Sequence, residues 1–247
     1  MSKIYFGDSN DVAQRPAKIY VGDSNDVARL VSKVYVGGSD GKAHQCWPWK
    51  LLPRAYQQVE YIYNTNQTEF INAGFKVDSN TRTEMTFYVD SSVGYQNSYR
   101  ELYGVENTYS FDFYRYQTNQ RTRAYFNSMA IGITTTAMDT QHTVVFNKNS
   151  KFYLDGTETG STTSTFSQTA TNLILFGYSN SSNQNGKACN VPFRLYSFKA
   201  WQGSTIIRDM YPCYRISDTE VGLFDTVNGV FYGNDGTGIF YKGPDVN

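Results

Sequence analysis

RTEMTFYVD, residues 82–90, is the stretch that best indicates the fold, because its apolar and polar side chains alternate. Successive side chains of a β-strand point to opposite faces of a sheet, so this alternation predicts a strand with one buried face. The buried face is expected to carry Met85, Phe87 and Val89, and the opposite face Glu84, Thr86 and Tyr88. No stretch of the chain has a convincing helical period.

Similar strand signals continue along the chain, separated by turn residues. HTVVFNKNSKFYLDGTETG, residues 142–160, is typical of a hairpin with its turn at residues 147–150 and its second strand ending at Asp155-Gly156. NLILFGY, residues 172–178, is a short apolar run suited to one buried strand. These segments predict further strands of the same sheets.

Two more strand pairs are expected near the C-terminus. Residues 192–201 and 205–208 flank the polar turn Gln-Gly-Ser. Residues 221–225 and 230–232 flank Asn228-Gly229, a dipeptide that favours a two-residue turn. Many antiparallel strands over about 190 residues predict an all-β fold, a sandwich of the jelly-roll type.

The composition agrees with an all-β fold and excludes several partners. The 247-residue chain contains 21 Tyr and 16 Phe, and aromatic side chains pack well on sheets. Lys and Arg number 22, as do Asp and Glu, so a basic surface for nucleic acid is not expected. No apolar run approaches the roughly 20 residues of a membrane span, and the first residues lack a hydrophobic signal segment. We expect no nucleic-acid partner, no membrane insertion and no export.

The first 45 residues contain a tandem repeat with a period of 15 residues. KIYFGDSNDVAQRPA from Lys3 returns as KIYVGDSNDVARLVS from Lys18 and, degraded, as KVYVGGSDGKAHQCW from Lys33. Each copy predicts a strand, a turn rich in Gly, Asp, Ser and Asn, and a return strand. Because an isolated two-stranded hairpin is marginal in water, the repeats need a partner.

We therefore predict three segments. Residues 1–45 form hairpin repeats for anchoring or oligomerisation, residues 46–55 a linker with two prolines, and residues 56–247 the sandwich. The candidate anchor residues are the recurring tyrosines and turn aspartates Tyr5, Tyr20, Tyr35, Asp8 and Asp23.

Two ends of the predicted sandwich carry a family resemblance. LPRAYQQVEYIYNTNQTEFINAGFKVDSNTRTEM from Leu52, FRLYSFKAW from Phe193, IIRDMYPCYR from Ile206 and VGLFDTVNGVFYGNDGTGIFYKGPDV from Val221 resemble a concanavalin A/laminin-G-like domain of phage and prophage proteins. Repeats of the KxYVGDSN type also precede such domains. The resemblance implies a concanavalin A-like jelly roll in the virion, as tail, baseplate or capsid decoration. It also implies a homo-oligomer or contacts with other virion structural proteins, assembled in the host cytoplasm.

Catalysis is not expected. A glycoside hydrolase needs two converging carboxylates, whereas the acids here occur singly, as at Glu60, Glu69, Glu84, Glu101 and Glu106. His142 follows Asp139 by three residues, and we interpret it as an ordinary residue at the start of a strand. The prediction is a non-enzymatic protein, and a polysaccharide-degrading virion hydrolase is the enzymatic alternative.

No cofactor is predicted, and a Ca²⁺ site is the alternative. Asp225, Asn234 and Asp235 are oxygen donors that flank a hairpin and resemble calcium ligands in type. The same residues are also those of ordinary turns. No metal ligands are therefore assigned.

Glycan binding is the functional hypothesis for the sandwich. Sugars are held by aromatic faces together with amide and carboxylate hydrogen bonds. Candidates in loop-like stretches are Tyr95, Tyr99, Tyr103, Tyr109 and Asn183. Tyr-rich loops also serve packing and protein contacts. The expected function is thus a structural phage virion protein that adheres to host cell-surface glycans, and a bacterial lectin-like module unrelated to virions is the other alternative.

Overall fold

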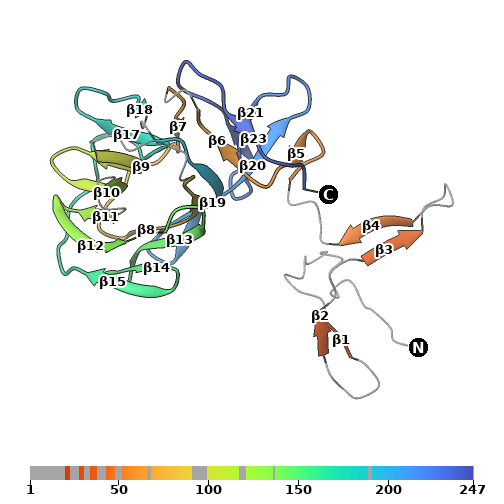
Figure 1. Cartoon of the computed structure of the whole chain (residues 1–247), viewed down its shortest axis with the longest axis horizontal. Helices are drawn as coiled ribbons and strands as arrows, with labels where there is room; N and C mark the ends of the chain where they lie inside the picture. The colour runs from red at the N-terminus through yellow and green to blue at the C-terminus, as the bar shows by residue number, and fades with distance from the viewer. Residues whose placement is uncertain are drawn as a thin grey trace. The chain divides into compact units, whose positions relative to one another are not determined.

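The computed structural model describes residues 20–22, 28–30, 34–37, 43–47, 52–65, 68–90, 99–116, 121–135, 137–188 and 191–246 (Figure 1). The chain divides into two compact units, residues 1–53 and 54–247. Within the described ranges every regular element is a β-strand, which confirms the all-β prediction.

The described residues of the N-terminal unit form two antiparallel strand pairs. β1 (Tyr20–Gly22) pairs with β2 (Ala28–Leu30), and β3 (Val34–Gly37) pairs with β4 (Ala43–Trp47). In the second and third repeats the described strands pair, while the predicted turns at residues 23–27 and 38–42 lie outside the described residues. β4 continues two residues beyond the expected end of the repeats at residue 45, and the second unit begins at Arg54, close to the expected residue 56.

The second unit is a sandwich of two sheets. The larger sheet has the order β15-β14-β13-β8-β19-β20-β21-β22, with β5 beside β20, β6 beside β19 and β23 beside β6. Its strands are β5 (Tyr56–Gln58), β6 (Ile62–Tyr63), β8 (Thr81–Tyr88), β13 (Gln141–Lys148), β14 (Lys151–Leu154), β15 (Thr157–Ser161), β19 (Arg194–Gln202), β20 (Thr205–Arg215), β21 (Val221–Asp225), β22 (Val230–Tyr232) and β23 (Tyr241–Lys242).

The smaller sheet faces it and has the order β12-β11-β10-β9-β16-β7. β17 lies parallel to β9 and antiparallel to β18, while the other described pairings are antiparallel. The strands are β7 (Ile71–Asn72), β9 (Tyr99–Glu106), β10 (Ser110–Tyr116), β11 (Arg121–Phe126), β12 (Met129–Thr135), β16 (Ile174–Leu175), β17 (Gly177–Asn180) and β18 (Lys187–Ala188).

The core between the sheets is largely aromatic. β8 alternates buried and half-buried residues along its whole length, as its sequence predicts, and Met85 and Phe87 point inward. Phe146 of β13 is fully buried, and its ring centroid lies 4.4 Å from that of Phe111 and 4.6 Å from that of Phe152. Such tilted and edge-on aromatic pairs add specific contacts to the burial of apolar area.

Two turns confirm the hairpin chemistry with shifted boundaries. β13 runs through Lys148, so the turn before β14 comprises Asn149 and Ser150, with φ of 53° and 62°. Asp155 and Gly156, with φ of 51° and 78°, make the next two-residue turn, between β14 and β15. Positive φ at both turn residues matches the right-handed twist of the flanking strands.

The predicted strand pair 221–225 and 230–232 is confirmed, but two details of local structure are wrong. The Asn228-Gly229 turn has four residues, 226–229, because the Asp225 carboxylate accepts hydrogen bonds from the Val227 amide (3.1 Å) and the Asn228 side chain (2.6 Å). Residues 172–178 form two strands, not one. Phe176, at a φ of 61°, separates β16 from β17, and its buried ring stacks on Phe193 at 4.3 Å between centroids.

Candidate functional site

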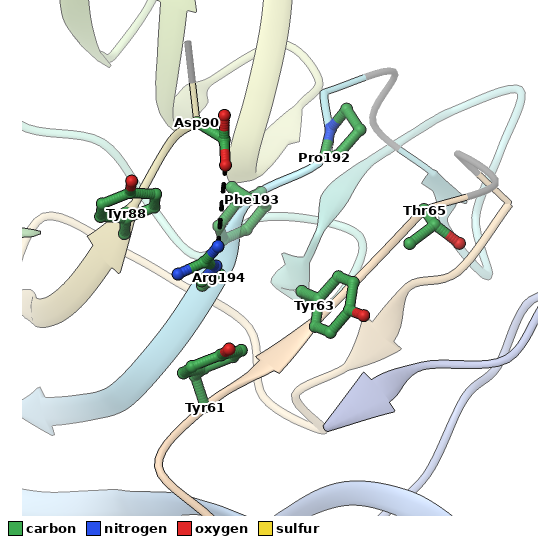
Figure 2. Close-up of a pocket in the computed structure, with 8 residues that line it drawn as sticks. All are labelled: Tyr61, Tyr63, Thr65, Tyr88, Asp90, Pro192, Phe193 and Arg194. Atoms are coloured by element: carbon green, nitrogen blue, oxygen red, sulfur yellow. Dashed lines mark ion pairs between the residues drawn. The ribbon is translucent and has the colours of Figure 1, made fainter. Parts of the chain in front are cut away.

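A pocket of about 270 Å³ lies where β6, β8 and β19 meet (Figure 2). Three stretches of chain line it: the β6 segment, the end of β8 and the start of β19. The lining residues are Tyr61, Tyr63, Thr65, Tyr88, Asp90, Pro192, Phe193 and Arg194, and we call this the tyrosine–arginine pocket.

The strand register places its side chains on one face. Arg194 of β19 is the Cα partner of Tyr63 on β6 and also of Tyr88 on β8. Directly opposite residues of neighbouring strands present their side chains on the same side of a sheet. Tyr241 of β23 continues the row, because it is the partner of Tyr63, and the two ring centroids lie 5.5 Å apart.

Arg194 stands between two tyrosine rings. Its guanidinium carbon is 4.9 Å from the Tyr61 ring centroid and 4.5 Å from the Tyr88 ring centroid. These are cation–π distances. In Figure 2, Tyr88 and Tyr63 are seen on opposite sides of Arg194. One guanidinium nitrogen lies 3.6 Å from the Asp90 carboxylate, an ion pair longer than a hydrogen bond. Both charged groups are about one-third exposed, so they remain accessible to a ligand.

The wall of the pocket is held by Asn64. This side chain is fully buried. Its amide donates a hydrogen bond to the Val191 carbonyl (3.1 Å) and its oxygen accepts one from the Phe193 amide (3.0 Å). Because buried polar groups are costly when unpaired, these two bonds fix the chain before β19 against the β6 segment. Phe193, a lining residue, is therefore held in place by Asn64.

The chemistry of the pocket is that of a small polar ligand with an apolar face. Tyrosine rings provide flat apolar surfaces with hydroxyls at their edges. Arg194 offers donors and Asp90 offers acceptors. A sugar ring, which has an apolar face and a rim of hydroxyls, matches this combination.

The structure does not bring together the five candidate glycan residues. Tyr95 lies outside the described residues, and Tyr99 is on β9. Tyr103 is fully buried, with its hydroxyl 2.9 Å from the Thr83 hydroxyl, so it cannot contact a glycan and this part of the prediction is wrong. Burial raises the pKa of its phenol, which stays neutral.

The other two candidates have partners within the fold. Tyr109 is partly buried against the core, and its ring centroid is 5.5 Å from that of Phe166. Asn183 donates its backbone and side-chain amides to the Asn180 side-chain oxygen, at 2.8 and 3.0 Å, within the loop before β18. Tyr109 packs against the core, whereas Asn183 remains a prediction.

The residues of the observed pocket carried a usable sequence signal. In residues 61–63 the apolar Ile62 is flanked by two tyrosines, which places both tyrosines on the face opposite a buried Ile62. Tyr88 was assigned to the outer face of its strand from alternation alone. The sequence does not indicate that β6 and β8 both pair with β19, the strand that carries Arg194.

The carboxylates of the smaller sheet form a cluster that the sequence did not predict. Glu101 and Glu106 of β9 interact by a hydrogen bond, and Asp112 of β10 adds its charge. The Cα partner of Asp112 is Gly104, and a Cβ at Gly104 would lie 2.4 Å from that of Asp112. Glycine at residue 104 therefore leaves the space that Asp112 fills.

Burial dominates the electrostatics of this cluster. It raises the pKa of Glu101 to about 7, helped by the charge and hydrogen bond of Glu106 and opposed by Lys187. It also raises the pKa of Asp112 well above its ordinary value, with the charges of Glu106 and Glu101 adding to the effect. Glu101 is 7% exposed and Asp112 is 3% exposed, so neither faces a groove that would admit a polymer.

His142 does not form a hydrolytic triad. Its Nδ1 lies 2.6 Å from an Asp155 carboxylate oxygen, and its Nε2 lies 2.9 Å from the Ala137 carbonyl oxygen. A carbonyl only accepts, so Nε2 carries a proton and offers no lone pair to a serine. His142 lies in β13, in agreement with an ordinary structural role. Asp139, the acid three residues before it, accepts a hydrogen bond from the Tyr88 hydroxyl at 3.2 Å.

The three candidate Ca²⁺ ligands, Asp225, Asn234 and Asp235, each accept a hydrogen bond from a backbone amide of the fold. Asp225 is fully buried and also accepts from the Asp209 amide at 2.9 Å. Asn234 accepts from the Phe70 amide at 3.1 Å, and Asp235 accepts from the amide of residue 72 at 2.7 Å. Within the part of the chain that the structure describes, no group of three His, Cys, Asp or Glu could hold a metal ion.

Of the anchor candidates, Tyr20 lies in β1 and Tyr35 in β3. Tyr5, Asp8 and Asp23 lie outside the described residues. The described part of the chain contains no helix with the length and apolar character needed to cross a membrane.

Comparison with known proteins adds no relative: no family model, curated protein or solved structure matches the chain. The class of protein is therefore defined by the fold and the site, an antiparallel β-sandwich with a tyrosine–arginine pocket, preceded by hairpin repeats.

Proposed function

We propose that the protein is a structural component of a phage virion, anchored by its N-terminal repeats, whose concanavalin A-like sandwich binds host-surface glycans in the tyrosine–arginine pocket. The pocket is the observation that carries the binding proposal, because it combines aromatic faces with a partly exposed arginine–aspartate ion pair. The virion assignment follows from the resemblance of the sequence.

The anchoring role is supported by the separation of the two units. The repeats belong to residues 1–53, and their described strands form pairs of only three to five residues a strand. Hairpins of this size are not stable by themselves in water. A second copy of the chain or another virion protein supplies the missing packing surface in this proposal.

Deleting residues 1–53 tests the anchor. The remaining chain, residues 54–247, contains the whole sandwich. It is expected to stay folded and soluble and to keep the β-sheet circular dichroism signal of the sandwich. Particles assembled with the truncated chain should lack it, as measured by mass spectrometry of purified virions. Normal incorporation of the truncated chain would contradict the anchoring role.

Replacing Arg194 by alanine tests the pocket. The change removes the cation held between Tyr61 and Tyr88, so we expect glycan affinity to fall by at least about tenfold, which corresponds to about 1.4 kcal/mol. Binding is measured by calorimetry with the strongest ligand from a glycan array. Tyr153→Ala is the matched control, because Tyr153 is a half-buried tyrosine of the same sheet outside the pocket. Equal binding by both variants would rule out this pocket.

A polysaccharide hydrolase is the second candidate, and the Glu101–Glu106 carboxyl pair is the observation that favours it. Paired acids with one raised pKa are the groups that glycoside hydrolysis uses. Glu101, however, is buried, at 7% exposed, which argues against its contact with a polymeric substrate. Release of reducing ends from a host polysaccharide, abolished by Glu101→Gln, would establish the hydrolase and displace our proposal.

A further inference from the structure

The outward face of β19 continues beyond the pocket as a row of large side chains. Lys199 of β19 is the Cα partner of Glu84 on β8, and Trp201 is the partner of Arg82. The pairing shifts register between Leu195 and Ser197, which leaves Tyr196 as the extra residue of a bulge. Because of this shift, residues 199 and 201 point to the same side of the sheet as Arg194.

The row is physically continuous with the pocket. The Tyr196 ring centroid lies 5.3 Å from that of Tyr61, which itself lines the pocket. Farther along, the Lys199 ammonium lies 5.9 Å from the Tyr211 ring centroid. At the end of the row, the Arg82 guanidinium stacks on Trp201 at 4.1 Å. The stacked pair presents a flat, rigid surface of aromatic and cationic character.

Every cation of the row is matched by a neighbouring carboxylate. Lys199 lies 3.4 Å from Asp209, and Arg82 lies 3.4 Å from Glu84. Arg194 pairs with Asp90 in the pocket. The row therefore carries no net charge from these pairs, so it offers an acidic ligand no net electrostatic attraction and suits an uncharged one.

We propose that the outward face of β19, from the tyrosine–arginine pocket to Trp201, binds an extended neutral polysaccharide chain over several consecutive sugar units. This inference rests on the proposed glycan-binding function. Residues 194–201 cover roughly 20 Å of strand at about 3.3 Å per residue, a length greater than one sugar ring. The pocket holds one sugar unit, and the Trp201 surface stacks against a unit farther along the chain.

The experiment compares oligosaccharides of increasing length. Neutral ladders built on glucose, galactose, mannose and N-acetylglucosamine, from disaccharide to hexasaccharide, are titrated calorimetrically into the full-length protein. We expect the hexasaccharide of the recognised ladder to bind at least about tenfold more tightly than its disaccharide. Ladders that carry uronic acids or sulfate should bind more weakly than the neutral one.

Two variants separate the ends of the binding face. Trp201→Ala is expected to lower hexasaccharide affinity about tenfold and to change disaccharide affinity by less than about twofold. Tyr63→Ala should weaken both, since it alters the pocket. Trp201→Phe, which keeps an aromatic face, should restore most of the length dependence. Thermal unfolding verifies that each variant is folded.

The outcomes distinguish this inference from the function on which it rests. Binding by the wild-type protein that does not depend on chain length would overturn the extended site and leave glycan binding intact. Preference for the acidic ladders would overturn the neutral-ligand assignment. No binding to any ladder or to the glycan array would overturn both proposals.

Discussion

Phe146→Ala is expected to lower the free energy of unfolding by about 4 kcal/mol, because large aromatic truncations in a core lose transfer free energy and leave a cavity. Phe146 is fully buried in β13, and its ring contacts Phe111 of the opposite sheet and Phe152 of the neighbouring strand. It also lies edge-on to Tyr103, at 6.3 Å between centroids. The substitution therefore removes contacts on both sides of the sandwich.

Chemical denaturation and calorimetry measure this change. A loss of about 4 kcal/mol lowers the Tm of a domain of this size by roughly 8–16 °C. Tyr153→Ala serves as the control, since Tyr153 is on the adjacent strand and points away from the core. Its change should stay below about 1 kcal/mol. Similar losses for the two variants would mean that Phe146 is not central to the core.

Glu101→Gln is expected to stabilise the protein by about 3 kcal/mol at pH 8 and to leave its stability unchanged near pH 4. The folded-state pKa of Glu101 is about 7, raised by burial and by Glu106, against 4.5 ordinarily. A difference of that size corresponds to about 3 kcal/mol. At a pH below the ordinary pKa, Glu101 is protonated in the folded and the unfolded state, so it does not lower the free energy of unfolding.

The sign follows from proton binding. Between about pH 4.5 and 7 the folded state keeps the proton that the unfolded state releases, so wild-type stability falls as pH rises through this window. Above it the full cost of an ionised, buried carboxylate remains. Glutamine has the same shape and stays neutral, which removes the contribution of Glu101 to this dependence. The contribution of Asp112, whose pKa is also raised by burial, remains.

Urea denaturation at several pH values checks this prediction. Glu158→Gln is the control, because Glu158 is exposed and pairs with exposed Lys151 at 2.7 Å, and ion pairs on the surface contribute little to stability. We expect the Glu158 variant to follow the wild-type pH profile. Parallel profiles for the wild type and the Glu101 variant would refute the buried-carboxyl assignment.

Local sequence patterns predicted the outward orientation of some pocket residues but not the pocket itself. Alternation assigned Tyr88 to the outer face of β8, and the same reasoning applies to Tyr61 and Tyr63 around Ile62. It did not predict that Arg194 would lie between Tyr61 and Tyr88. The prediction for Tyr103 was wrong for a related reason, because the sequence around it was interpreted as loop although β9 begins at Tyr99 and buries Tyr103.

The sequence by itself determined the strand class, the two faces of β8, a turn within residues 147–150 and the end of the following strand near Asp155-Gly156. These are properties of neighbouring residues, set by side-chain alternation and by the φ values that each residue tolerates. The tertiary structure alone decided the tyrosine–arginine pocket and the carboxyl pair of Glu101 and Glu106. Both depend on which strands become neighbours, in what register and with what bulge, and on how deeply the packed fold buries each group. Long-range pairing sets that arrangement, and no local pattern records it.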